Sequence, residues 1–123
     1  MLKEIVLVGL GGGVGSIMRF LTSKYVCKFF PHELPLATFI VNVAGCLLIG
    51  LLIGISSRNN LLAEDIRLLL IVGFCGGFTT FSTFSLENLH LYQAGNYWLL
   101  AVYILTSVIF GIGFVWLGYI ITK

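Results

Sequence analysis

Four long apolar segments constrain the fold of this chain more than any other feature of its sequence. They cover residues 4–26, 34–55, 66–92 and 97–121. Each is at least as long as the ~20 residues that an α-helix needs to cross a bilayer. Charged residues make up 10% of the chain, whereas a soluble domain carries about 25%. The sequence therefore predicts an all-α integral membrane protein, with residues 1–123 forming a single domain of four transmembrane helices.

The third apolar segment contains an interruption. Its run 73–85, GFCGGFTTFSTFS, holds three glycines and five hydroxyl side chains. Glycine is a poor helix former, and Ser and Thr favour helix starts over helix interiors. We therefore expect the third helix to break near Gly76–Thr80 and then restart. Non-helical backbone at membrane depth must be buried in protein or face a polar cavity, so the break indicates a permeation or binding site.

Polar and aromatic residues near this break are candidates for that site. Asn42 lies near the centre of the second segment, where an unbonded amide is costly, so it should face the protein interior. Two interpretations of Asn42 stay open, a helix–helix hydrogen bond and a donor turned toward a polar path. Phe81 and Phe84 share one face of the restarted helix, with the hydroxyls of Ser82 and Thr83 beside it. Because phenyl edges are positive, rings lining a narrow pore favour an anion without a fixed charge.

Four further polar residues allow two interpretations each. Tyr103 and Ser107 stack on one face of the fourth helix, where they either line a track or serve packing. Arg19 either leads anions into a vestibule or anchors the first helix by snorkelling. Glu87 is interpreted as an interfacial hydrogen-bonding residue rather than a proton carrier. No Lys or Arg falls in the middle of the second, third or fourth segment, which suits a conducting pore that must not bind too tightly.

Other functional patterns are weak in this sequence. The glycine-rich run 9–15 lacks a preceding strand and a following Lys-Ser/Thr, so it predicts close helix packing rather than a nucleotide loop. The three cysteines have no metal-ligand spacing and are expected to be inert apolar residues. The N-terminus is not expected to be a signal peptide, because its apolar region is broken by glycines. No nucleophile–base pair or metal set is visible, so we expect no enzyme.

The charges that flank the segments leave the orientation in the membrane open. An even number of spans places both termini on one side. That side carries slightly more Lys and Arg, which weakly favours cytoplasmic termini, but the near balance also fits insertion in both orientations. The residues counted are Lys3, Arg58, Arg67 and Lys123 beside the termini, and Lys24, Lys28 and, if it snorkels outward, Arg19 on the other side. Because four helices enclose little on their own, we expect a homodimer to cover the polar groups.

The sequence resembles the CrcB/Fluc family of fluoride channels. The segment 76–85, GGFTTFSTFS, followed by Glu87 looks like the family signature, and the glycine-rich run with Arg19 and the segment 38–45 with Asn42 also fit. The resemblance covers all four segments. It implies an antiparallel, dual-topology homodimer, or a pair of homologous subunits, in the inner (plasma) membrane. Such a dimer exports toxic fluoride passively through two pores.

The resemblance also implies roles for individual residues. Gly76 and Thr79 match the positions whose backbone carbonyls hold a central sodium ion at the dimer interface. Where the polar track continues in some relatives, this chain has Gly111 and Val115, which leaves the end of the track open. The residues implied along the fluoride path are Phe81, Phe84, Asn42, Ser82, Thr83, Tyr103 and Ser107, with Arg19 in the vestibule.

One alternative function belongs to a different class of small four-helix dimers, the proton-coupled multidrug exporters. These exporters depend on a carboxylate deep in the first helix. In this chain Glu4 stands at the very start of the first segment, and the next acidic residue is Glu33. The sequence therefore disfavours this alternative.

Overall fold

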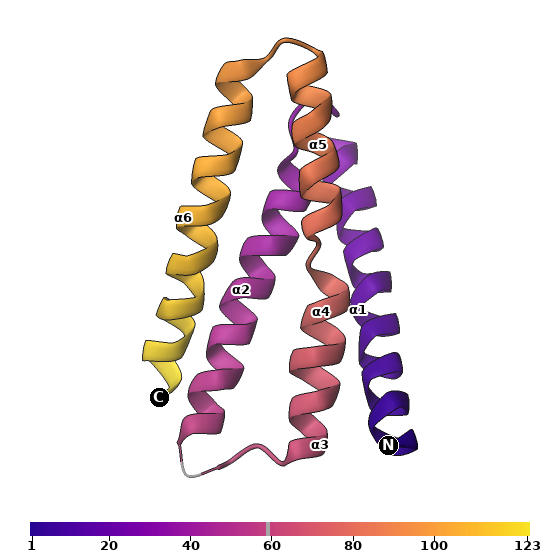
Figure 1. Ribbon diagram of the computed structural model, residues 1–123, viewed down its shortest axis with the longest axis vertical. Coiled ribbons are helices and arrows are strands. Elements are labelled where there is room, and N and C mark those ends of the chain that lie inside the picture. Colours follow the sequence, from indigo (N-terminus) through magenta and orange to yellow (C-terminus); the bar gives the residue numbers. More distant parts are fainter. Residues whose placement is uncertain (59) are drawn as a thin grey trace.

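The computed structural model describes residues 1–58 and 60–123 and consists of helical rods joined by short connections (Figure 1). Four stretches are long and apolar enough to cross a membrane: Leu2–Phe29, Leu36–Ser57, Glu64–Gln93 and Tyr97–Thr122. The predicted number and order of spans are therefore confirmed. The helical elements are α1 (Leu2–Phe29), α2 (Leu36–Ser57), α3 (Glu64–Arg67), the π-helix η1 (Leu68–Cys75), α4 (Gly76–Phe78), α5 (Phe81–Gln93) and α6 (Tyr97–Thr122).

Helix α1 extends a few residues beyond the predicted range at both ends. It ends at Phe29, after which Phe30 is extended with φ −129° and ψ 149°. Phe30 precedes Pro31, and the residue before a proline is pushed out of the helical region. The proline, rather than the end of the apolar run, therefore sets the length of this helix.

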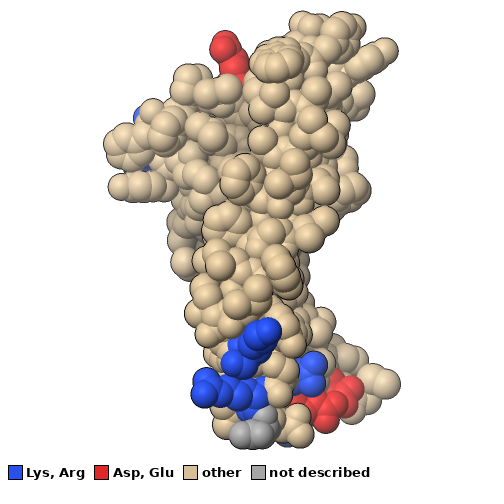
Figure 2. Space-filling model, turned by 90° about the vertical axis from the view of Figure 1, so that its left-hand side faces the viewer, with Lys and Arg blue, Asp and Glu red and all other residues tan. Residues whose placement is uncertain are grey.

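Both chain termini lie at the same end of the bundle, as an even number of spans requires (Figure 1). Lys and Arg side chains gather at this end on the face seen in Figure 2. An ion pair between Lys3 and Asp65 joins α1 to α3 there. The opposite end carries the connections formed by residues 30–35 and 94–96.

The rods pack in pairs, α1 against η1 and α4, and α2 against α6. Gly11 and Gly15 make the first pair possible. A Cβ atom at Gly11 would collide with the backbone of Leu69 and Phe74, and one at Gly15 with the backbone of Phe74 and Phe78. The prediction that the run 9–15 serves close helix packing is confirmed.

Most large apolar side chains of this single chain point outward. Among the described residues only a few side chains are buried, with Val41 fully enclosed, whereas Phe81 is 78% exposed and Trp98 is 81% exposed. A contiguous apolar surface of this kind belongs against lipid or another protein surface. The bundle therefore encloses little by itself.

The π-helix η1 was not predicted from the sequence. It occupies Leu68–Cys75, immediately before the predicted break. Such wide turns are rare and frequently lie at functional sites. The third rod thus departs from α-helical geometry both before and at the break.

Candidate functional site

The backbone of the third rod leaves helical geometry at two residues. Thr79 has φ −86° and ψ 160°, and Thr80 has φ −152° and ψ 120°. The break is narrower than predicted, because Gly76–Phe78 remains helical as α4. The threonines rather than the glycines leave the helix, because side chains supply alternative hydrogen-bond partners around Thr80.

Asn42 of α2 supplies the first of these partners. Its Oδ1 accepts the backbone N–H of Thr80 at 2.8 Å, and its Nδ2 donates to the carbonyl of Thr80 at 3.0 Å. The Asn42 amide therefore makes a helix–helix hydrogen-bonded pair, one of the two interpretations that the sequence left open. Its second Nδ2 hydrogen makes no hydrogen bond within the part of the chain described here, and Asn42 lines a cavity.

The side chain of Thr80 starts the next helix. Its Oγ1 accepts the backbone N–H of Thr83 at 3.1 Å, which makes Thr80 the N-cap of α5. Thr80 Oγ1 also donates to Thr83 Oγ1 and contacts Ser82 Oγ, both at 3.2 Å. The N–H groups of Phe81 and Ser82 make no hydrogen bond among residues 1–58 and 60–123. The start of α5 thus presents free donors and the positive end of a helix dipole.

The same side chains release two backbone carbonyls. In an unbroken helix, the N–H of Thr80 would bond to Gly76 O and the N–H of Thr83 to Thr79 O. Here these two N–H groups bond to Asn42 Oδ1 and Thr80 Oγ1 instead. The carbonyls of Gly76 and Thr79 therefore accept no hydrogen bond from the described residues. They are the two carbonyls that the resemblance assigns to a sodium ion.

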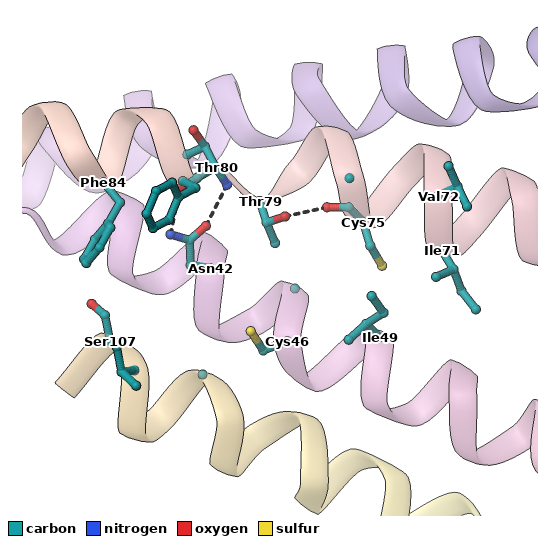
Figure 3. A pocket seen from close by; sticks show the side chains of 15 residues that line it. Asn42, Cys46, Ile49, Ile71, Val72, Cys75, Thr79, Thr80, Phe84 and Ser107 are labelled. Atoms are coloured by element: carbon teal, nitrogen blue, oxygen red, sulfur yellow. Dashed lines mark hydrogen bonds between the residues drawn. The ribbon is translucent and has the colours of Figure 1, made fainter. Parts of the chain in front are cut away.

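A cavity of about 540 Å³ lies between the break, α2 and α6 (Figure 3). No charged side chain lines it in the described part of the chain. It brings together six of the residues singled out from the sequence, Asn42, Gly76, Thr79, Phe81, Phe84 and Ser107. Ser107 Oγ is buried without a hydrogen-bond partner among the described residues. Gly111 also lines this cavity, whereas Val115 packs against Gly50 of α2.

The aromatic residues of the site are coupled to a carboxylate. The rings of Phe81 and Phe84 have centroids 5.8 Å apart. The Tyr103 ring meets the Phe84 ring edge-on at 5.0 Å, and the Tyr103 hydroxyl donates to Glu87 Oε1 at 3.1 Å. Tyr103 is 4% exposed and lies behind Phe84 rather than on the cavity wall. Glu87 is thus a hydrogen-bonding residue, as interpreted from the sequence.

A second, smaller cavity of about 220 Å³ lies on the α1 side of the break. It contains Arg19 and Thr83, which the structure therefore separates from the aromatic cavity. The guanidinium shares this cavity with several hydroxyl groups, a donor set suited to an anion. The hydroxyl residues are Ser16, Ser23, Thr38, Thr80 and Thr83. Ser82 lines neither cavity, and its hydroxyl contacts Thr80.

Comparison with known proteins identifies the family. Residues 6–119 match the family model described as CrcB-like protein, Camphor Resistance (CrcB). The chain belongs to the CrcB family. The predicted resemblance is confirmed, and the four spans make this CrcB member a multi-pass membrane protein.

Curated CrcB relatives match along their whole length. The fluoride-specific ion channel FluC of Azobacteroides pseudotrichonymphae is 54% identical over 123 residues, which cover 100% of this chain and 98% of the relative. FluC of Flavobacterium psychrophilum is 43% identical over 122 residues, which cover 99% of this chain and 98% of the relative. FluC of Campylobacter jejuni strain RM1221 is 43% identical over 123 residues and covers both chains completely.

Sequence reasoning missed the central position of Thr80. It treated Thr80 as one of several hydroxyl residues, whereas its backbone and side chain take part in five hydrogen bonds. A threonine immediately before a helix restart is an N-cap signal, and Thr80 stands directly before α5. The pairing with Asn42 joins residues 38 positions apart, and no local pattern reveals it.

Proposed function

We propose that this chain is a passive channel that lets fluoride leave the cell across the inner membrane. The observation that carries the proposal is the hydrogen-bonded break between Asn42 and Thr80. Beside this break, the N–H of Phe81 makes no hydrogen bond to the described residues, and Phe81 lines a cavity with no charged side chain among them. The full-length relatives that bear the name fluoride-specific ion channel support the choice of ion.

The donors match the needs of a small, strongly hydrated anion. Fluoride gives up its water only where other donors replace that water. Donors of this kind are the backbone N–H of Phe81, the second Nδ2 hydrogen of Asn42 and the hydroxyl of Ser107, and the N–H of Ser82 lies at the same helix start. The positive edges of Phe81 and Phe84 add attraction without a counter-ion. Because no Lys or Arg side chain lines this cavity among the described residues, the ion is held weakly enough to leave again.

Arg19 attracts the ion before it reaches the aromatic cavity. Its cavity lies on the other side of the break and is lined by hydroxyl groups. A partly exposed guanidinium raises the local concentration of anions by its charge. Arg19 thus serves as the vestibule residue, Ser82 and Thr83 lie beside the path, and Tyr103 supports Phe84.

The working unit is an antiparallel homodimer with two pores. Gly76 is exposed, and a side chain added there would meet no atom within 4 Å. A second chain can therefore approach the break closely. The large exposed apolar surface of the single chain supports such a partner.

A sodium ion fits the dimer axis. Hard cations take oxygen ligands, and the carbonyls of Gly76 and Thr79 are released from helical hydrogen bonding. These carbonyls from both chains would hold the ion. When bound, the sodium ion would supply positive charge between the broken helices of the two chains.

Ion efflux from liposomes tests the proposed function. Vesicles that contain the purified protein are loaded with potassium fluoride or potassium chloride, with sodium present on both sides. Fluoride should leave rapidly once a potassium ionophore balances the charge, and chloride should leave slowly. Efflux that needs a proton gradient instead of the ionophore would indicate an exchanger. The acidic residue of α1, Glu4, lies in its first turn, which disfavours that outcome.

A further inference from the structure

Thr80 is the one residue that lines both cavities of the site. The smaller cavity holds Arg19 and hydroxyl groups, and the larger one holds Phe81, Phe84 and Asn42. Among the described residues, no other side chain is common to the two linings. Both cavities therefore border Thr80, which is 8% exposed.

Two sets of hydrogen bonds hold Thr80 in position, one to its backbone and one to its side chain. Its N–H and its carbonyl are both bonded to the Asn42 amide. Its hydroxyl is bonded within the first turn of α5, to the N–H and Oγ1 of Thr83. Backbone and side chain are thus fixed by different helices, so Thr80 does not swing aside as an unbonded loop residue would.

We propose that Thr80 is the specificity-determining partition between the two cavities. The inference rests on the proposed function, because it assumes that fluoride passes from the Arg19 cavity to the aromatic cavity. An ion that takes this route must cross beside the Thr80 side chain. The methyl group of Thr80 narrows the crossing, and its hydroxyl hydrogen can serve a passing anion.

The hydrogen bonds of the Thr80 hydroxyl leave it able to donate to a passing anion. Its donated bond to Thr83 Oγ1 is 3.2 Å long, beyond the usual 2.7–2.8 Å for a bond between two hydroxyl oxygens. If the Thr80 hydroxyl turned its hydrogen toward an anion instead, only this weak bond to Thr83 Oγ1 would be lost. Fluoride accepts hydrogen bonds strongly and is small, whereas chloride is larger and gains less from one donor. A narrow crossing with one movable donor therefore favours fluoride.

Two substitutions separate the methyl from the hydroxyl. Thr80→Ser removes the methyl and keeps both the hydroxyl and the N-cap. Thr80→Val keeps the width and removes the hydroxyl. The matched control is Thr106→Ser, which removes a methyl from a half-buried threonine of α6 that lines neither cavity and bonds to Val102 O.

Fluoride and chloride efflux from liposomes are measured for all four proteins. Thr80→Ser should keep fluoride efflux and raise chloride efflux by at least about tenfold, the usual effect of one methyl on discrimination. Thr80→Val should lower fluoride efflux by about tenfold or more, because a hydrogen bond to a charged group is lost. Thr106→Ser should behave as the unaltered protein.

The outcomes distinguish this inference from the proposed function. If the unaltered protein releases no fluoride, the proposed function fails. If it releases fluoride and Thr80→Ser keeps the same ratio of fluoride to chloride efflux, the partition is wrong and the channel stands. Thermal melting in detergent identifies a variant that has lost its fold. Thr80→Ser retains the cap, so its ratio decides the question even if Thr80→Val unfolds.

Discussion

The side-chain amide of Asn42 bonds both the N–H and the carbonyl of a single residue, Thr80. An amide in this position replaces the two partners that a continuous helix would give to Thr80. The backbone groups of Thr80 itself are therefore satisfied by protein. This arrangement lets non-helical backbone exist at membrane depth.

Removing this amide should destabilise the protein. In Asn42→Leu, the N–H and the carbonyl of Thr80 both lose their partners. Each buried unpaired group costs about 1–3 kcal/mol. Chemical or thermal unfolding in detergent measures the loss. Thr22→Val is the control, because the Thr22 hydroxyl is exposed and bonds only to Met18 O of its own helix; a similar loss in both variants would contradict this role of Asn42.

The close approach of α1 to the third rod gives a second prediction. Gly15→Ala places a Cβ against the backbone of Phe74 and Phe78, whereas Gly13→Ala places one in open space. Gly15→Ala should lower stability by about 1–3 kcal/mol, as overpacking does. Gly13→Ala should be neutral or stabilise by up to about 1 kcal/mol, because alanine is the better helix former. Equal melting temperatures for the two variants would rule out the close packing.

The aromatic path gives a third prediction. Phe81→Ile and Phe84→Ile keep an apolar side chain but remove the positive ring edge. Fluoride efflux should fall by roughly tenfold, equivalent to about 1.4 kcal/mol, while the dimer persists. Phe110→Ile is the control, since this exposed ring of α6 lines neither cavity. Unaltered efflux in both test variants would mean that ring edges do not attract the ion.

The contact between Tyr103 and Glu87 gives a fourth prediction. Glu87→Leu leaves the Tyr103 hydroxyl without its acceptor, at a cost of about 1–3 kcal/mol. Glu87→Gln keeps an acceptor oxygen and should retain most of the stability and the fluoride efflux. If the pair acts as a unit, Glu87→Leu and Tyr103→Phe together should cost less than the sum of the two single changes. Strict additivity in unfolding measurements would show that the pair is not coupled.

The freed carbonyls give a fifth prediction. Sodium should raise the melting temperature of the detergent-solubilised dimer, and the gain should grow with the logarithm of its concentration once the site is filled. Choline chloride at equal ionic strength is the control, because choline cannot be coordinated by a small ring of carbonyl oxygens. An equal response to sodium and choline would argue against a site at Gly76 and Thr79.

Much of this architecture could be predicted from the sequence, because long apolar segments have few alternatives. The spans, the tight packing of the glycine-rich run and a break in the third helix all follow from local residue properties. The exact residues at which the third helix breaks do not follow from local residue properties. Glycine at 76 and 77 weakens the helix, but a hydrogen-bond donor or acceptor must be present to replace helical bonds. That partner, Asn42, lies on another helix.

The sequence predicted a vestibule residue, Arg19, and a separate path along the phenylalanines, but it did not predict which hydroxyl residues lie with Arg19. Motif position grouped Thr83 with Phe81 and Phe84, whereas in the structure Thr83 lines the cavity of Arg19. Helical spacing likewise placed Tyr103 beside Ser107. Their shared face is real, but the Phe84 ring covers Tyr103. These differences depend on side-chain packing between helices, which no pattern within one segment records.

The separation of Asn42 and Thr80 along the chain also bears on the order of assembly. Until α2 lies beside the third rod, Thr80 has no partner outside its own helix. A lone segment in lipid must satisfy its backbone internally, so it is most stable as one continuous helix. We therefore expect the break to be stable only once the third segment lies against Asn42 of α2. Packing against α2, rather than the local sequence alone, would then stabilise the geometry that leaves the carbonyls of Gly76 and Thr79 without helical partners.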